Sequence, residues 1–244
     1  MPKSQTPIYV AKYPVTNSQF ERFIKDGGYE NPAYWGGEDS PAWRWRTCKP
    51  RYNWQRTDAP DFWDDPRFGK SRRGYPVVGV TWYEANAYCK WLEEQVTNCK
   101  LQIRLVGGDS NLQLLTSNLQ CRLPTDEEWV ASAGGEKEGE EDRYPWGPEW
   151  DESRANTDES GIGGTTPVGM YPSGQSPHGI WDMRGNVWEW LSSRVEGLGR
   201  ETYALRGGSW NLGRGRVRVL GGLPGRSDQH DGFRVVASPA GSGS

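Results

Sequence analysis

The stretch RGGSWNLGRGRVRV, residues 206–219, concentrates side chains that could do chemistry. From Arg206 to Arg226 the chain carries five arginines and seven glycines. That composition suits a nucleic-acid patch, a phosphate-cradling loop or a recognition surface. A reaction centre is the fourth alternative, but no Cys or His lies between Arg206 and Gln229 to act as a nucleophile. The stretch is not repeated and strand-like segments flank it, so we expect one ordered loop rather than an RNA-binding tail.

A second group of polar residues lies in the turn WDMRGNVWEW (181–190). Asp182 and Glu189 bracket backbone carbonyls, and such an all-oxygen set is what Ca²⁺ prefers. The alternative is a capped turn whose carboxylates accept backbone amides and pair with Arg184 or Arg206. The spacing alone favours the capped turn.

Other motifs exclude further chemistries. In CRLPTDEEW (121–129) the acidic residues are typical of a helix N-terminus, with Glu128 as the capping partner, and do not indicate acid–base catalysis. GIGGTTPVG (161–169) has no Lys after its glycines and is not a phosphate loop. With only His178 and His230, a His-rich zinc or iron site is excluded.

The four cysteines are too few for a disulfide scaffold, and none form a CxxC pair. They are Cys48, Cys89, Cys99 and Cys121. We expect reduced, mostly buried thiols. The alternative is a bridge between Cys99 and Cys121.

The composition predicts a folded, loop-rich domain with an aromatic core. Mean hydropathy is −0.86, yet there are 14 Trp, 11 Tyr and 5 Phe, and disordered chains are poor in such residues. The net charge of −3 gives no general attraction to nucleic acid or anionic membrane. We find no apolar run of about 18 residues and no signal-peptide pattern, so we expect a cytoplasmic protein by default, with surface display through another route as the alternative.

Three helix starts carry a capping box, in which a Thr is followed three residues later by Gln or Glu. They are TNSQF (16–20), TWYEA (81–85) and TDEEW (125–129). Strands are expected at 8–15, 75–80, 205–210 and 232–236, and as a hairpin at 101–106 and 111–116. We therefore predict one α+β domain over 1–237, with a hairpin insertion at 93–120 and a flexible tail at 238–244.

Nine short motifs occur in order along the chain between Tyr9 and Val236. They are YPVTNSQF, PVVGVTWYEANAYCKWL, CRLPTDEEW, YPWG, ANTDESG, TTPVG, GIWDMRGNVWEW, LRGGSW and GFRVV. The set resembles the formylglycine-generating enzyme (sulfatase-modifying factor) family. The resemblance implies a C-type lectin-like fold with two helices, small antiparallel sheets and abundant ordered loops.

The resemblance also implies structural calcium, which favours the metal interpretation of the 181–190 turn. The corresponding ligands are the side chains of Asp182 and Glu189 and the carbonyls of Gly185 and Val187. A second family site would begin at Asn156 and Thr157, although the segment that follows them is short here.

The sequence departs from the family at its reaction centre. Catalytic members carry two cysteines, five residues apart, after the GGS-aromatic strand, and these positions are Leu212 and Val217 here. Neither side chain can ligate copper or form a mixed disulfide, so we expect no copper and no formylglycine-generating activity. The related ergothioneine-type synthases use a His-rich iron domain, which does not suit this chain.

Another branch that the chain resembles is the variable proteins of diversity-generating retroelements. Their segment between the GGSW and GFRVV strands, 211–231 here, is diversified and binds ligand. The adenine-directed code never yields Lys, Glu, Met, Trp or Gln, and none of these occurs from Leu212 to Asp228. The predicted ligand-binding residues are Leu212, Gly213, Arg214, Gly215, Arg216, Leu220, Gly221, Gly222, Leu223, Arg226, Ser227 and Asp228.

We therefore predict a non-catalytic protein that binds an acidic or amphipathic protein ligand through this loop face, without nucleic acid or membrane insertion. The alternatives are a sulfatase-modifying-type oxidoreductase or pseudo-enzyme that has lost its cysteine pair, and a structural module of a larger assembly.

Overall fold

The computed structural model describes residues 7–48, 58–98, 119–135, 144–197, 199–214 and 220–240. The α-helices in these ranges are α1 (Asn17–Lys25), α2 (Pro41–Thr47), α3 (Trp82–Thr97) and α5 (Asp126–Ala133). Short 3₁₀ turns lie at Pro32–Trp35, Glu152–Arg154, Asp158–Ser160 and Pro172–Gly174. None of the described helices is long and apolar enough to cross a bilayer. The predicted hairpin at 101–106 and 111–116 lies outside the described residues, as does Cys99.

All three predicted capping boxes are confirmed. Thr16, Thr81 and Thr125 each accept a hydrogen bond from the third helical amide, and the Gln or Glu side chain at that position returns to the cap. Each such cap stabilises its helix by about 1 kcal/mol. Helix α5 ends at Gly134, whose φ of 95° is one that glycine adopts readily.

The strands form two small sheets. In the first, β7 (Val236–Pro239) lies between β1 (Tyr9–Val10) and β2 (Leu119–Arg122). The second has the order β5 (Leu220–Gly222), β4 (Tyr203–Arg206), β3 (Trp188–Arg194) and β6 (Asp231–Gly232). All pairings are antiparallel except that between β3 and β6, which is parallel.

The predicted α+β class is confirmed, and several details differ from expectation. Helix α2 was not predicted, whereas α1, α3 and α5 begin at the three predicted capping boxes. Residues 75–80 form no strand; Pro76 makes a single bridge to Thr16, since proline cannot donate to a ladder. The predicted strand at 232–236 is divided between β6 and β7. The tail prediction was wrong for Ser238 and Pro239, because they continue β7 and pair with β2.

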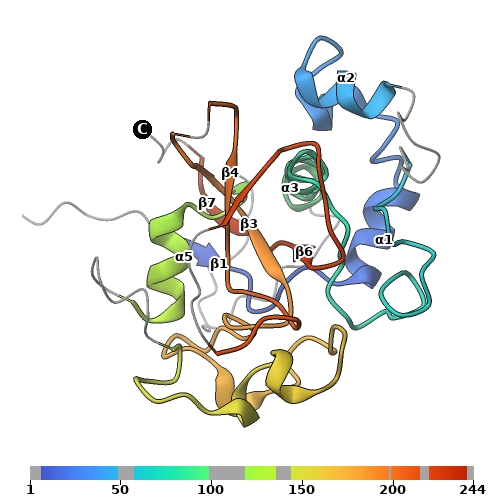
Figure 1. The fold of residues 1–244 in the computed structure, drawn as a ribbon. Coiled ribbons are helices and arrows are strands. Elements are labelled where there is room, and N and C mark those ends of the chain that lie inside the picture. The colour runs from blue at the N-terminus through green and yellow to red at the C-terminus, as the bar shows by residue number, and fades with distance from the viewer. Residues whose placement is uncertain are drawn as a thin grey trace, which may run out of the picture.

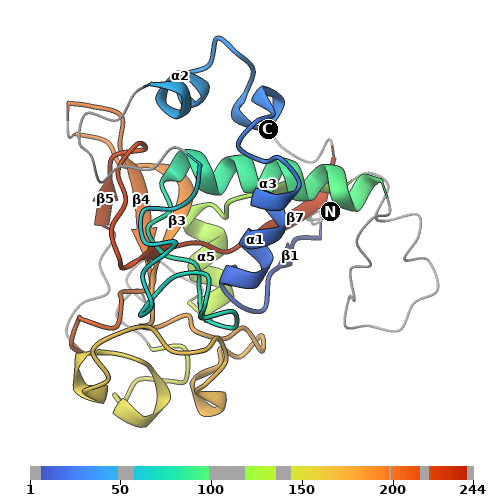
Figure 2. The same cartoon turned by 90° about the vertical axis from the view of Figure 1, so that its right-hand side faces the viewer.

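Aromatic rings build the main core between α1, α3 and the C-terminal segment. Phe20 stacks on Tyr88 at 5.5 Å and meets Phe233 edge-on at 6.2 Å. Each such ring removes a large apolar area from water, which compensates for the scarcity of aliphatic residues. Helix α3 runs between α2 and the sheets, and the loops around 150–175 gather at the opposite end from α2 (Figures 1 and 2).

Three of the cysteines are described, and all three are free thiols. Cys89 and Cys121 are buried, and burial raises the pKa of the Cys121 thiol to about 12. Cys121 is therefore not bridged, contrary to the alternative that paired it with Cys99.

Glu84 provides a test of the core through pH. Its buried carboxyl accepts hydrogen bonds from Thr81 and from the Tyr29 hydroxyl, and burial raises its pKa from 4.5 to about 7. In that pH window the folded chain keeps a proton that the unfolded chain loses, so this contribution to stability falls as the pH rises.

Glutamine does not titrate, so the unfolding free energy of Glu84→Gln should not show this fall. Relative to the parent, it should therefore rise by on the order of 2 kcal/mol between pH 5 and pH 8. Urea denaturation at several pH values measures this. Glu127→Gln, at an exposed position of α5, is the control and should follow the parent. The same dependence of unfolding free energy on pH in Glu84→Gln and in the parent would contradict the prediction.

Candidate functional site

The segment after β4 is held through its main chain. The Asp158 amide donates to the Leu212 carbonyl at 3.1 Å. The Glu159 carboxylate accepts the Arg214 amide at 2.6 Å, and Arg184 Nη2 donates to the Arg214 carbonyl at 2.9 Å. The side chains of Leu212 and Arg214 are exposed. The contacts that position this part of the loop therefore do not depend on its exposed side chains.

The same arrangement holds the returning part of the loop. Strand β5 pairs with β4, Trp45 Nε1 donates to the Gly225 carbonyl at 3.1 Å, and the Gly79 amide donates to the Asp228 carbonyl at 3.0 Å. Leu220, Gly221, Arg226 and Asp228 are exposed here, while Leu223 is half-buried. The structure thus brings most of the described predicted ligand-binding residues to one solvent-facing segment.

The structure constrains some of the predicted ligand-binding residues. The Ser227 hydroxyl donates to Asp61 at 2.7 Å. A Cβ at Gly222 would lie 2.2 Å from the Trp190 ring, so this position cannot take a side chain unless Trp190 moves. Gly215, Arg216 and Val217 lie outside the described residues.

The turn at 181–190 is built around the pair Gly185–Asn186. A Cβ at Gly185, where φ is 72°, would lie 2.2 Å from the Asn156 carbonyl, so only glycine allows this approach. Asn186 also has a positive φ, of 65°, and its buried Oδ1 accepts the Thr166 amide at 3.0 Å. These contacts join the turn to the 156–166 loop.

Glu189 forms a buried ion pair with Arg234. Arg234 donates from Nε and Nη2 to the two carboxylate oxygens, each at 2.6 Å, and Trp129 Nε1 donates to Oε2 at 2.7 Å. Both charged side chains are fully buried. The predicted partners of this carboxylate were therefore wrong. Arg206 instead pairs with Asp126, while Arg184 donates to carbonyls.

The calcium ligands that the resemblance implies fit a cation only in part. Asp182 Oδ2 accepts the Gly169 amide at 2.7 Å, and Oδ1 accepts no hydrogen bond from the described residues. Burial raises the pKa of Asp182 to about 6. Three hydrogen bonds to Glu189 leave it about one of its four acceptor positions, and Arg234 already supplies it with positive charge. Asp182 and the carbonyls of Gly185 and Val187 would be the main ligands.

At the second implied calcium site, oxygens of both named residues already accept hydrogen bonds. Asn156 Oδ1 accepts from the Ser160 hydroxyl at 3.1 Å, and the Thr157 carbonyl accepts the Ser160 amide at 3.0 Å. No group of three or more His, Cys, Asp or Glu side chains suited to a metal occurs in the described part of the chain.

The sequence interpretation missed an aromatic cluster beside the loop. Tyr144, Trp146 and Trp150 have ring centroids 5.1–5.9 Å apart, and the Arg184 guanidinium lies 5.6 Å from the rings of Tyr144 and Trp150. The Tyr144 hydroxyl also donates to the Arg214 carbonyl at 3.3 Å. Three rings within the seven residues YPWGPEW were the available signal.

A family model, described as the sulfatase-modifying factor enzyme 1-like domain, matches residues 3–239. The chain belongs to this family. Members of the family are similar to it over most of its length. The inactive C-alpha-formylglycine-generating enzyme 2 of Mus musculus is 30% identical, across 95% of this chain and 75% of that protein.

Other relatives carry different descriptions. A hercynine oxygenase of Mycolicibacterium thermoresistibile is 31% identical, across 82% of this chain and 43% of that protein. The structure of Treponema denticola variable protein 1 matches with a TM-score of 0.57 and 18% identity, across 95% of this chain and 84% of that one. At that identity the likeness concerns the fold, and the predicted formylglycine-generating-enzyme-type fold is confirmed. The family includes inactive and enzymatic members, so membership alone assigns no activity.

The Glu189–Arg234 pair predicts a large effect of removing one partner. Arg234→Met leaves a buried, unpaired carboxylate and should lower the unfolding free energy by about 3–5 kcal/mol. Lys70→Ala, which removes a surface pair with Asp64, should cost less than about 1 kcal/mol. Chemical denaturation of both variants measures this, and equal losses would contradict the buried pair's structural role.

Proposed function

We propose that the chain is a non-catalytic binding protein whose loop face, residues 211–231, takes a protein ligand and is diversified by a retroelement. The observation that carries the proposal is the main-chain anchoring of this segment. Asp158, Glu159, Arg184 and Trp45 bind its amides and carbonyls, so exposed side chains can change while the backbone stays in place. A preformed backbone also lowers the entropy that a ligand must remove on binding.

The lost cysteine pair supports a binding role over a catalytic one. Leu212 stands at the first catalytic position of the family and has no thiol for copper ligation or disulfide exchange. Of the described thiols, Cys89 and Cys121 are buried with raised pKa values, and Cys48 lies at the end of α2. None belongs to the segment after β4. The alternative is a pseudo-enzyme, which the inactive mouse relative favours.

The exposed side chains indicate the ligand's character. Leu212 and Leu220 are 39% and 46% exposed, and Arg214 and Arg226 are exposed beside them. Leucine and arginine separated by glycine suit an acidic or amphipathic protein surface. Nucleic acid is a poorer match, because the chain carries net negative charge.

The proposal predicts that the loop tolerates substitution. A variant with Leu212, Arg214, Leu220 and Arg226 all changed to Ser should melt within about 3 °C of the parent, since surface changes cost little. Arg184→Met, which removes an anchor, should lower the melting temperature further. Melting followed by circular dichroism compares them. Unfolding of the loop variant alone would refute the display role.

An activity assay on the parent chain distinguishes a binding protein from an enzyme. A cysteine-bearing sulfatase-type peptide, incubated with the chain and copper, should keep its mass. Conversion of the cysteine to formylglycine would overturn the proposal. The gene gives an independent check, since diversification requires an Asn-rich near-copy of the loop and a nearby reverse transcriptase.

We further propose a structural calcium ion at Asp182, Gly185 and Val187, with one oxygen of Glu189. Excess chelator should then lower the melting temperature of the parent by several degrees, and Asp182→Ala should abolish the difference between chelated and calcium-loaded samples. Asp39→Asn, at an exposed loop position, should keep it. An unchanged melting temperature on chelation would remove the calcium proposal and leave the binding role standing.

A further inference from the structure

A pocket lies beside the aromatic cluster formed by Tyr144, Trp146 and Trp150, and two of these rings, Trp146 and Trp150, line it. Tyr144 and Gly147 bridge to each other, and the φ of 128° at Gly147 allows the tight return that brings the rings together. Tyr144 stacks on Trp146 with the ring planes 9° apart. Trp146 Nε1 donates to the Glu149 carbonyl at 3.0 Å, which holds the indole in place.

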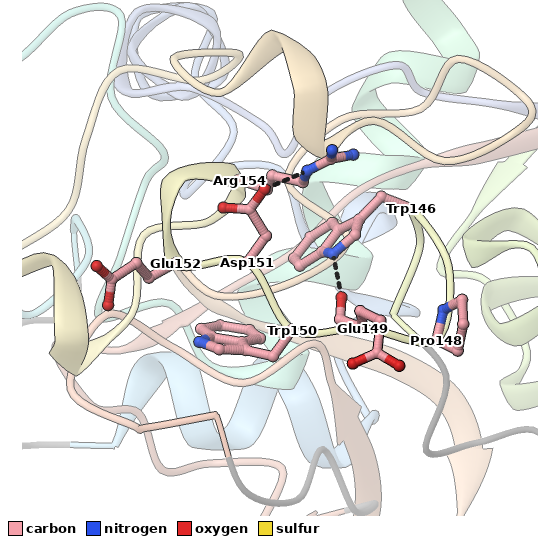
Figure 3. A pocket seen from close by; sticks show the side chains of 7 residues that line it. All are labelled: Trp146, Pro148, Glu149, Trp150, Asp151, Glu152 and Arg154. Atoms are coloured by element: carbon pink, nitrogen blue, oxygen red, sulfur yellow. Dashed lines mark hydrogen bonds and ion pairs between the residues drawn. The ribbon is translucent and has the colours of Figure 1, made fainter.

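The pocket has a volume of about 490 Å³, within the usual range for small-molecule sites. Figure 3 shows its lining: Trp146, Pro148, Glu149, Trp150, Asp151, Glu152 and Arg154. The two indoles lie in the middle of the view, with Glu152 to one side and Glu149 and Pro148 to the other. Both indole rings are half-buried, so each keeps surface that a ligand can cover.

The charges around the pocket are negative. Asp151 pairs with Arg154 at 2.8 Å, and hydrogen bonds from Ser153 and Arg154 lower its pKa to about 2, so it is ionised. The carboxylates of Glu149 and Glu152 are exposed and have no ion-pair or hydrogen-bond partner among the described residues. Three carboxylates thus face one guanidinium, which leaves an excess of two negative charges.

The cluster already binds one cation that does not line the pocket. The Arg184 guanidinium lies 5.6 Å from the ring centroids of Tyr144 and Trp150, within the range of cation–π attraction. Within the pocket, Trp146 and Trp150 offer ring surface beside the unpaired carboxylates of Glu149 and Glu152, and the one guanidinium of the lining, Arg154, is paired with Asp151. Aromatic rings and carboxylates together attract an organic cation and repel an anion.

We propose that this pocket binds the cationic side chain of a polypeptide, the guanidinium of arginine or the ammonium of lysine. The cation stacks on Trp146 and Trp150 and pairs with Glu149 and Glu152. Because the Tyr144 hydroxyl reaches the Arg214 carbonyl, the pocket borders the loop face. In combination with the proposed function, the ligand would present a basic side chain to the pocket and acidic or apolar groups to the loop. The cation site itself does not depend on loop diversification.

Small cationic probes test the site on the whole chain. N-acetyl-arginine methylamide and N-acetyl-lysine methylamide should shift the indole N–H resonances of Trp146 and Trp150 saturably in a ¹⁵N spectrum. For so small a contact we expect a dissociation constant of about 1 mM or weaker. The neutral analogue N-acetyl-citrulline methylamide should leave these signals unchanged. Equal shifts with the neutral analogue would overturn the proposal.

Variants locate the interaction. The double variant Glu149→Gln/Glu152→Gln alters only exposed side chains and should weaken arginine binding by about three- to tenfold. Trp150→Leu should weaken it comparably by removing a ring. The matched control Glu38→Gln/Asp39→Asn makes the same charge change at exposed positions just before α2, and should bind as the parent does. Unchanged binding by the glutamine double variant would refute the site, whereas the loop-variant melting test bears only on the display role.

Discussion

The buried ion pair between Glu189 and Arg234 is the constraint on which the arrangement of the domain depends. Glu189 lies on β3, and Arg234 lies just before β7. Arg234 also donates to the carbonyls of Ala11 and Trp181, and Trp129 of α5 donates to Glu189. A buried charge pair is stable only when nearly all its hydrogen bonds are made. Both sheets, α5 and the 181–190 turn must therefore assume their positions together.

The loop face is under a different constraint. From 211 to 214 and again from 220 to 231, partners outside the loop bind mainly its carbonyls and amides. Hydrogen bonds to main-chain groups do not depend on which side chain the residue carries. Packing still restricts some positions, such as Gly222, where the Trp190 ring excludes a Cβ. The core therefore tolerates few substitutions, whereas exposed positions of this surface segment can change their side chains.

Two surfaces of opposite charge lie next to each other at the loop face. The loop exposes Arg214, Arg226 and leucines, while the pocket beside it exposes Glu149, Glu152 and two indoles. Tyr144 and Arg184 connect the two surfaces through the Arg214 carbonyl. A protein ligand with neighbouring acidic and basic groups would match both, and alternating charge favours specificity over raw affinity. Neither surface contains a cysteine.

The sequence by itself determined the features whose causes are local. The capping boxes at Thr16, Thr81 and Thr125 join residues three apart, so the helix starts were predictable. The aromatic core followed from composition, and Leu212 was readable as a departure from the family's cysteine once the motifs were aligned.

Only the tertiary structure decided the long-range partners. Glu189 could be placed in its turn, but its partner could not be predicted: the sequence suggested Arg184 or Arg206, and the structure pairs it with Arg234. The choice of Arg234, 45 residues away, rests on the packing of the two sheets. Trp45 of α2 likewise reaches Gly225 across 180 residues of sequence. The pocket, by contrast, is lined by residues within the single segment 146–154, and the structure adds the turn that brings their rings and carboxylates together.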